Sequence, residues 1–189
     1  MAKALAGAFK APLVTSTTSR LLVDLNRSIG HPQLFSAATR GAPPALRAKI
    51  VEQHYRPYRA QVEGLVRRSV SRGRVIHISS HSFTPSLYGE VRNADVGLLY
   101  HPGRHREAAL CARWKASLAQ SAPRLRVRRN YPYAGKGDGL TSHLRRTFRD
   151  GVYVGIELEV NQKIVRAAGR RWTELRRTLI DSLRAAAVA

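Results

Sequence analysis

The sequence predicts one α/β domain over residues 1–189, with helices flanking a mostly parallel or mixed β-sheet. Three observations support this fold class. The length suits one domain of ordinary size with its own core. Short β-rich segments alternate with helical ones, and this order is typical of α/β domains. The stretch 152–160 alternates apolar and other residues with a period of two, as a strand does.

The first half of the chain is predicted to join short extended segments to one long helix. A helix over residues 2–9 ends before Pro12, and strand or extended segments follow at 13–15 and 21–25. Apolar residues then recur every three or four positions along residues 46–70, as on one face of a long helix. Pro57 is expected to kink that helix because it lacks a backbone N–H.

The second half is predicted to hold the remaining strands and helices. A β-rich strand over residues 74–80 ends at the turn-like sequence SHSFTP. The other expected strands and helices are 95–100, 104–120, 125–129, 140–148 and 152–160. A last helix begins at Asn161, a natural N-cap, and carries an apolar stripe that includes Ala168 and Trp172.

Two carboxylates mark the strand 152–160. The chain has only 12 acidic residues against 33 basic ones, yet Glu157 and Glu159 lie two apart among Val, Ile and Leu. A period of two places both on one face, where like charges and partial burial raise the pKa of one member. Such a pair suits general acid–base catalysis. The alternatives are an edge strand with a solvated face and carboxylates paired with Arg.

Other polar residues are expected at the same rim of the sheet. His81 follows the strand 74–80, and Asn26 with Arg27 follows the segment 21–25. Ligands of open α/β sheets bind beyond the carboxyl ends of the strands. His81 is therefore a metal ligand, a general base or a hydrogen-bonded structural residue, whereas His77 in mid-strand is expected to support the site. An Arg fork binds carboxylates, so Arg27 with Asn26 is a candidate anion site.

The charge and the cysteine content of the chain indicate which binding partners and which cellular location to expect. A net charge of +21 is typical of proteins that bind nucleic acid. The basic residues are scattered, however, and aromatic residues amount to 7%, so nucleic acid is not the expected main partner. The longest apolar runs are too short to span a bilayer, so no membrane partner is expected. A single cysteine, Cys111, and no evident signal peptide favour a reducing, cytoplasmic location.

Several stretches together resemble the N-formylglutamate amidohydrolase family. They are TSRLLVDLNRSIGHPQLFS, HYRPYR, ISSHSFTP, RNADVGLLYHPGR, VRRNYPYAGKGDGLT and GIELEVNQ, in consistent order along most of the chain. The resemblance implies a fold like that of zinc carboxypeptidases and aspartoacylase. It also implies metal-dependent hydrolysis of N-acyl amino acids such as N-formylglutamate.

The resemblance also implies roles for individual residues. His81 in SHSF matches a zinc ligand, and Glu159 in ELEVNQ matches the general base. Asn26 and Arg27 match the pair that binds the substrate's carboxylate, while Arg20 matches the Arg that polarises the scissile carbonyl. Glu157 and His77 are then expected to support these groups.

One departure bears on activity. The family's first His and its acidic partner precede the DLNR motif, but residues 1–26 contain no His and no Glu. We therefore expect this chain to lack the first metal-binding segment. Zinc sites of this kind need three protein ligands, so His81 alone would bind zinc poorly. The alternative function is that of a catalytically inactive relative whose basic surface binds an anion or nucleic acid.

Overall fold

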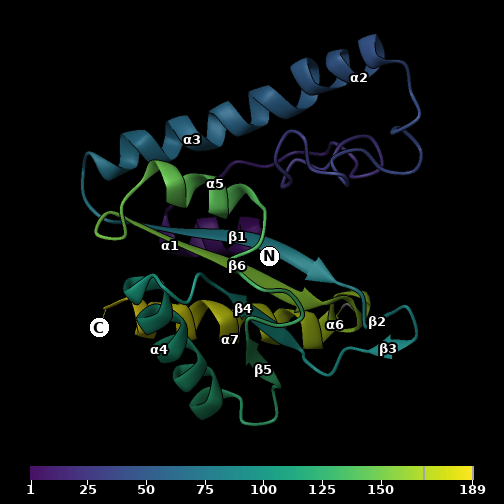
Figure 1. Ribbon diagram of the computed structural model, residues 1–189. Coiled ribbons are helices and arrows are strands. Elements are labelled where there is room, and N and C mark those ends of the chain that lie inside the picture. The colour runs from purple at the N-terminus through teal and green to yellow at the C-terminus, as the bar shows by residue number, and fades with distance from the viewer. Residues whose placement is uncertain (168, 189) are drawn as a thin grey trace.

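A four-stranded mixed sheet forms the centre of the computed structural model, which describes residues 1–167 and 169–188 (Figure 1). Its order is β1-β6-β4-β5. β1 pairs with β6 in parallel, β4 with β6 antiparallel and β5 with β4 in parallel. The strands are β1 (Val75–Phe83), β4 (Val96–Leu99), β5 (Val127–Arg129) and β6 (Tyr153–Asn161). β2 (Ser86–Leu87) and β3 (Glu90–Val91) form a separate antiparallel pair. The predicted α/β fold with a mixed sheet is confirmed.

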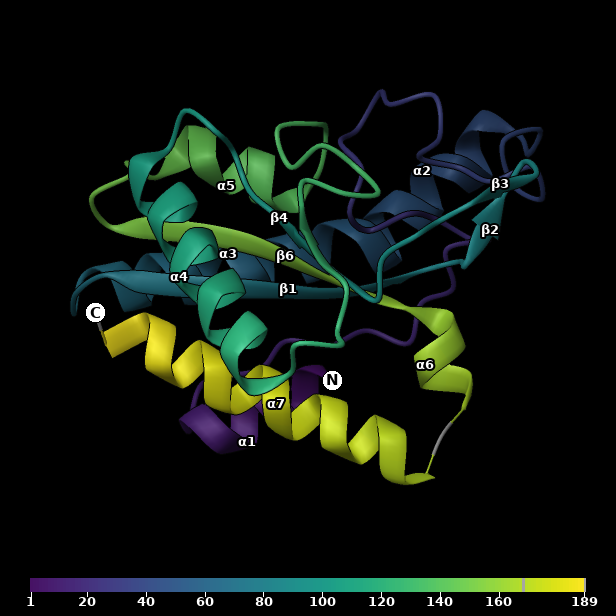
Figure 2. The ribbon, with the colours of Figure 1, turned by 90° about the horizontal axis from the view of Figure 1, so that it is seen from below.

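Helices cover both faces of the sheet. α3 (Arg56–Val70) and α5 (Leu140–Thr147) lie on one side, and α4 (His105–Ser121) and α7 (Gly169–Val188) lie on the other (Figure 1). The short helix α1 (Ala2–Phe9) packs beside α7 (Figure 2). None of the helices in the described part of the chain is both long enough and apolar enough to cross a membrane.

The alternation of side chains along β6 determines which face of the sheet carries the main core. Its apolar residues Val154, Ile156, Leu158 and Val160 are buried in one cluster with residues of α4 and α7. Trp114 is fully buried in this cluster, and its indole N–H donates to Ser182 Oγ at 2.9 Å. Glu157 and Glu159 must then point to the opposite face, as predicted.

The long helix predicted over residues 46–70 is present, with a local change of winding. α2 (Pro44–Ile50) runs into a π-helical turn, η1 (Val51–Tyr55), and then into α3. The turn ends two residues before Pro57, whose missing N–H cannot join the helical hydrogen bonds. The structure thus shows a π-helical turn before Pro57, and the predicted kink at Pro57 itself stays a prediction.

The segments 13–15 and 21–25, predicted as strand or extended, do not form strands, since residues 11–43 contain neither helix nor strand. Polar side chains satisfy the backbone locally and so favour turns over a sheet ladder. Ser19 Oγ accepts from Leu21 N–H at 3.1 Å, and Asp24 Oδ1 accepts from Asn26 N–H at 3.0 Å.

The last helix is divided. Asn161 caps α6 (Gln162–Arg166) as predicted, because its Oδ1 accepts from Lys163 N–H at 3.0 Å. α7 starts only at Gly169, whose φ of 57° breaks the helical path. Ala168 of the predicted stripe lies outside the described residues.

Candidate active site

The parallel pairing of β1 with β6 brings the predicted histidine and carboxylates together. His81 lies directly opposite Glu159 in the register, and Ser79 lies opposite Glu157. All four are on the same face by the alternation of the two strands. His81 was expected beyond the end of its strand, and that expectation is wrong. β1 continues to Phe83, which pairs with Asn161 and is buried.

Glu159 is the most unusual carboxylate in the molecule. Its residue is 5% exposed, and its Oε2 is buried without a hydrogen-bond partner among the described residues. Burial, helped by the negative charge of Glu157, raises the pKa of Glu159 to about 7, although Arg20 and Arg92 oppose the shift. Near neutral pH this carboxyl group can therefore both accept and release a proton.

A glycine in β4 leaves room for a loop beside Glu159. Gly97 is the antiparallel partner of Glu159. A Cβ added at Gly97 would lie 2.0 Å from the carbonyl oxygen of Tyr131 and 3.2 Å from Glu159 Cβ. Only glycine allows this approach, so the loop after β5 lies against the sheet right next to the carboxylate.

The neighbours of Glu159 are held by hydrogen bonds. Ser79 Oγ lies 2.8 Å from His81 Nε2, and Thr141 Oγ1 of α5 donates to Glu157 Oε1. Burial lowers the pKa of His81, against the opposing charge of Glu157, so the imidazole is neutral at pH 7. His81 therefore has a lone pair available for a proton or a metal.

His77 lies four residues before His81 in β1. Its Nδ1 lies 2.8 Å from the hydroxyl of Tyr153, the residue that starts β6. Burial lowers the pKa of His77 to about 4, with smaller effects from His81 and Arg145. The ring is therefore neutral and fixed by its neighbour.

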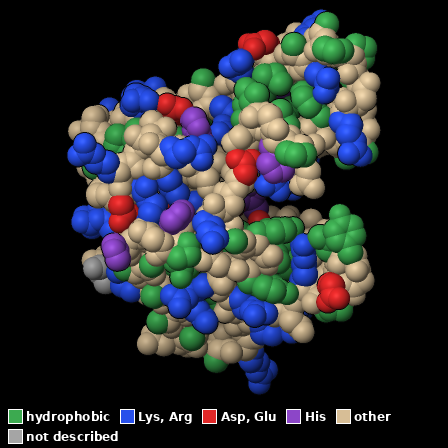
Figure 3. Space-filling model, in the orientation of Figure 1, with side chains coloured by type: hydrophobic (Ala, Val, Ile, Leu, Met, Phe, Trp, Pro, Cys, Tyr) green, Lys and Arg blue, Asp and Glu red, His purple; other side chains and the backbone are tan. Residues whose placement is uncertain are grey.

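The segment that carries Arg20 approaches His81 and Glu159. Arg20 Nη2 donates to Asp24 Oδ2 at 2.6 Å, and Asp24 is buried. The charges of Arg20 and Asp24 both act on His81, and Arg20 also acts on Glu159. In the space-filling view the molecule is hollowed between the part formed by α2 with the long loop and the part that carries β2 and β3 (Figure 3). Acidic and histidine side chains are visible at its inner end.

Asn26 and Arg27 are hydrogen-bonded mainly to the glycine-rich loop, residues 131–139, and to α5. Asn26 Oδ1 accepts from Leu140 N–H at 2.8 Å, at the start of α5. Arg27 Nη1 donates to the carbonyl oxygen of Asp138 at 3.3 Å, and its Nε lies 3.9 Å from Asp24. These two residues therefore help to build the wall of the site, and Arg27 is 28% exposed beside it.

Two residues of the helix above fix this segment. Tyr55 OH donates to the carbonyl oxygen of Arg27 at 2.7 Å, and Arg59 Nη1 donates to that of Asn26 at 3.3 Å. An irregular loop thus keeps a defined position because helix side chains saturate its carbonyl groups.

Comparison with known proteins identifies the family of the chain. The family model described as N-formylglutamate amidohydrolase matches residues 1–165. The chain belongs to the N-formylglutamate amidohydrolase family. No curated protein matches the chain in sequence.

Two solved structures share the fold of this family member. One is a gene product from Agrobacterium tumefaciens, with a TM-score of 0.79 and 24% identity, over 99% of this chain and 75% of that chain. The other is N-formylglutamate amidohydrolase from Ralstonia eutropha, with a TM-score of 0.59 and 22% identity, over 76% of this chain and 54% of that chain.

The residues of this family member do not by themselves fit a zinc ion. Within residues 1–167 and 169–188, no three His, Cys, Asp or Glu side chains gather closely enough to hold a metal. His81 Nε2 is instead within hydrogen-bond distance of Ser79. A structural zinc needs four protein ligands and a catalytic zinc about three, so we assign no step to a metal.

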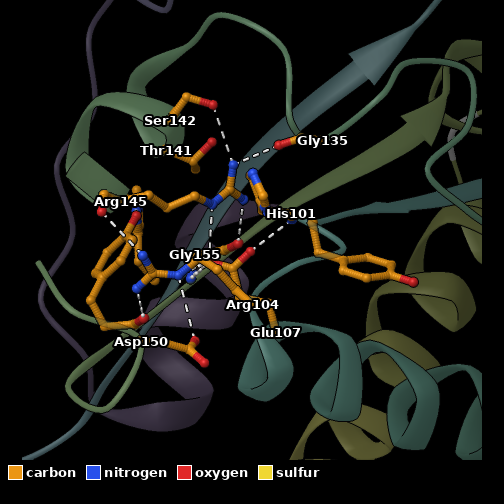
Figure 4. A network of polar contacts seen from close by, with 12 residues as sticks. His101, Arg104, Glu107, Gly135, Thr141, Ser142, Arg145, Asp150 and Gly155 are labelled. Atoms are coloured by element: carbon orange, nitrogen blue, oxygen red, sulfur yellow. Dashed lines mark hydrogen bonds and ion pairs between the residues drawn. The ribbon is translucent and has the colours of Figure 1, made fainter.

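Sequence reasoning missed a buried ion network behind the site (Figure 4). Glu107 is fully buried, and its Oε1 accepts from Arg145 Nε at 3.0 Å and from Gly155 N–H at 3.2 Å. Arg104 Nε lies 3.3 Å from the same oxygen. Arg145 also donates to the carbonyl oxygens of Gly135 and Gly155. The network joins α4, α5, β6 and the glycine-rich loop, and so holds the strand that carries Glu159.

A signal for this network was present in the sequence. Glu107 is one of 12 acidic residues, and it lies three and four positions before Leu110 and Cys111, on the apolar face of its helix. An acidic residue on such a face must be paired, because an isolated buried charge is too costly.

Proposed function

We propose that this family member hydrolyses the amide bond of N-acylated acidic amino acids, N-formylglutamate among them, with Glu159 as the general base. The observation that supports it is the state of Glu159, which is buried, has a raised pKa and has one oxygen without a partner among the described residues. A base that works at neutral pH needs a pKa near 7. The family assignment supplies the reaction class.

In the proposed reaction, Glu159 takes a proton from a water molecule, whose oxygen attacks the carbonyl carbon of the acyl group. Arg20 stabilises the negative charge that develops on the carbonyl oxygen. When the C–N bond breaks, the proton passes from Glu159 to the leaving nitrogen. The products are the free acid, formate in the case of N-formylglutamate, and the amino acid.

The substrate's carboxylate is proposed to bind at Asn26 and Arg27. Arg27 is partly exposed and is fixed by Asp138, and a guanidinium binds carboxylates through paired N–H groups. Glu157, held by Thr141, and His77, held by Tyr153, are proposed to keep Glu159 and His81 in place.

Zinc is proposed from the resemblance alone, with His81 as the ligand from this chain. The reducing cytoplasm remains the proposed location, in keeping with the free, buried Cys111.

Formate release from N-formylglutamate by this chain, measured with added zinc and after chelation, tests the proposal. Turnover that needs zinc supports both the reaction and the metal, and turnover that survives chelation supports the reaction without it. Absence of turnover in both conditions would contradict the proposed activity.

A second candidate function is binding of an anion or nucleic acid without catalysis. It is favoured by the absence of a three-ligand group among the described residues and by the net charge of +21. Binding of nucleic acid that is lost steeply as salt rises, together with no hydrolysis, would support it.

A further inference from the structure

An open pocket of about 280 Å³ adjoins the candidate active site. Arg20 and Asp24, whose charges act on His81, line one side of it. The rest of the lining comes from the loop after the DLNR motif, namely Pro32, Gln33, Phe35, Ser36, Ala37 and Arg40. Small-molecule sites begin at about 300 Å³, so the pocket can hold part of a substrate as well as water.

The wall that carries Arg40 is held in place. Ser36 Oγ donates to the carbonyl oxygen of Leu21 at 2.5 Å, and Thr39 Oγ1 donates to that of Leu22 at 2.9 Å. Arg40 N–H donates to the carbonyl oxygen of Ser36 at 2.9 Å. The backbone of Arg40 is therefore connected, through Ser36 and Thr39, to the turn just after Arg20.

The pocket carries a surplus of positive charge. Its charged lining is two guanidiniums, Arg20 and Arg40, against one carboxylate, Asp24. Asp24 is already paired with Arg20 at 2.6 Å and lies 3.9 Å from Arg27. Arg40 is exposed at this pocket, and in the described part of the chain its side chain makes no ion pair or hydrogen bond, so its guanidinium has no counter-charge.

The uncharged lining suits an aliphatic chain that ends in an anion. Pro32, Phe35 and Ala37 offer apolar contact for methylene groups, whereas the guanidinium of Arg40 offers a fork of N–H donors. Another arginine, Arg47, stacks over the Phe35 ring at 5.8 Å and adds to the positive field.

We propose that Arg40 is a specificity-determining residue, which binds the side-chain carboxylate of a dianionic N-acyl amino acid whose amide lies at Glu159. The inference rests on the proposed function and goes beyond it, because it names the residue that recognises the second negative charge. The first carboxylate is left to Asn26 and Arg27, which are not among the residues that line this pocket.

A matched pair of ligands tests this role by calorimetry at 150 mM salt. N-formylglutamate and N-formylglutamine have the same shape and differ in the charge of the side chain. We expect the wild-type chain to bind N-formylglutamate at least about tenfold more tightly, as for a hydrogen-bonded charge pair. Arg40→Ala should reduce this preference to about twofold or less and leave the Kd for N-formylglutamine unchanged.

Two further variants distinguish the paired N–H donors of the Arg40 guanidinium from the effect of positive charge alone. Arg40→Lys keeps the charge without the fork, so its preference should be intermediate. Arg171→Ala removes an exposed charge from α7, on the opposite side of the sheet, and should keep the full preference. Equal loss in Arg171→Ala, or an unchanged preference in Arg40→Ala, would overturn the role of Arg40.

The outcomes also distinguish this inference from the proposed function. If Arg40→Ala hydrolyses N-formylglutamate with an unchanged preference for it, the function stands and the role of Arg40 is overturned. If the wild type neither binds nor hydrolyses the two ligands, the proposed function fails. In that case glutarate, a dicarboxylate without an acyl group, tests carboxylate binding by Arg40 alone. Weaker binding of glutarate to Arg40→Ala than to wild type supports the role of Arg40, and equal binding overturns it.

Discussion

At the scale of single residues, Glu107 and Glu159 are both buried carboxylates with opposite surroundings. Glu107 accepts hydrogen bonds on both oxygens, from Arg145, Gly155 N–H and His101 N–H. Glu159 has a buried oxygen with no partner in the described chain. A satisfied buried ion fixes structure, whereas an unsatisfied one is available for chemistry.

Replacing Glu107 by glutamine tests its structural role. The substitution leaves the buried guanidinium of Arg145 without its counter-charge, so the free energy of unfolding should fall by roughly 3–5 kcal/mol. Urea denaturation at pH 7 measures this. The control is Glu52→Gln, which breaks an exposed pair with Arg56 and should cost at most about 1 kcal/mol. Similar small losses in both variants would contradict the structural role of the network.

At the scale of elements, Asp95 joins the start of β4 to its neighbours. Its carboxylate accepts from Arg126 N–H at 2.9 Å, beside β5, and lies 2.9 Å from Lys163 Nζ in α6. Burial by itself raises the pKa of Asp95, but the hydrogen bonds from Arg126 and Lys163 outweigh it and hold the pKa below its usual value.

This depressed pKa predicts a stability that depends on pH. A carboxylate whose pKa is lower in the folded state stabilises the fold above its unfolded pKa of about 3.9. The stabilisation is lost as the pH falls through the folded value. Unfolding of wild type and Asp95→Asn from pH 2.5 to 6 should show an advantage of the wild type that is constant above about pH 5 and shrinks below pH 4. An advantage independent of pH would contradict this assignment.

The elements that could be predicted are those whose pattern is long and regular. The alternation in β6 gave its two faces correctly, and the three-to-four spacing gave the helix through Pro57. The segment 21–25 looks like a strand by composition, but side chains of Ser19 and Asp24 satisfy its backbone. Such local competition depends on geometry that hydrophobic patterns do not carry.

At the scale of the whole molecule, the meeting of His81 with Glu159 could be predicted only as a shared rim of the sheet, because the direct pairing of their strands comes from the structure. The antiparallel placement of β4 could not, since nothing in its four residues fixes a direction. The pocket at Arg40 also depends on tertiary folding, because the loop of residues 11–43 has no regular pattern. Long-range contacts of an irregular loop leave little trace in sequence.

The most direct test of the account is the rate of formate release from N-formylglutamate by wild type and Glu159→Gln, at pH 7 with zinc supplied. Glutamine keeps the shape but cannot take a proton, so we predict a rate at least about a hundredfold lower, with unchanged circular dichroism. A Glu159→Gln variant that releases formate as fast as an active wild type would contradict the role of Glu159 as the base.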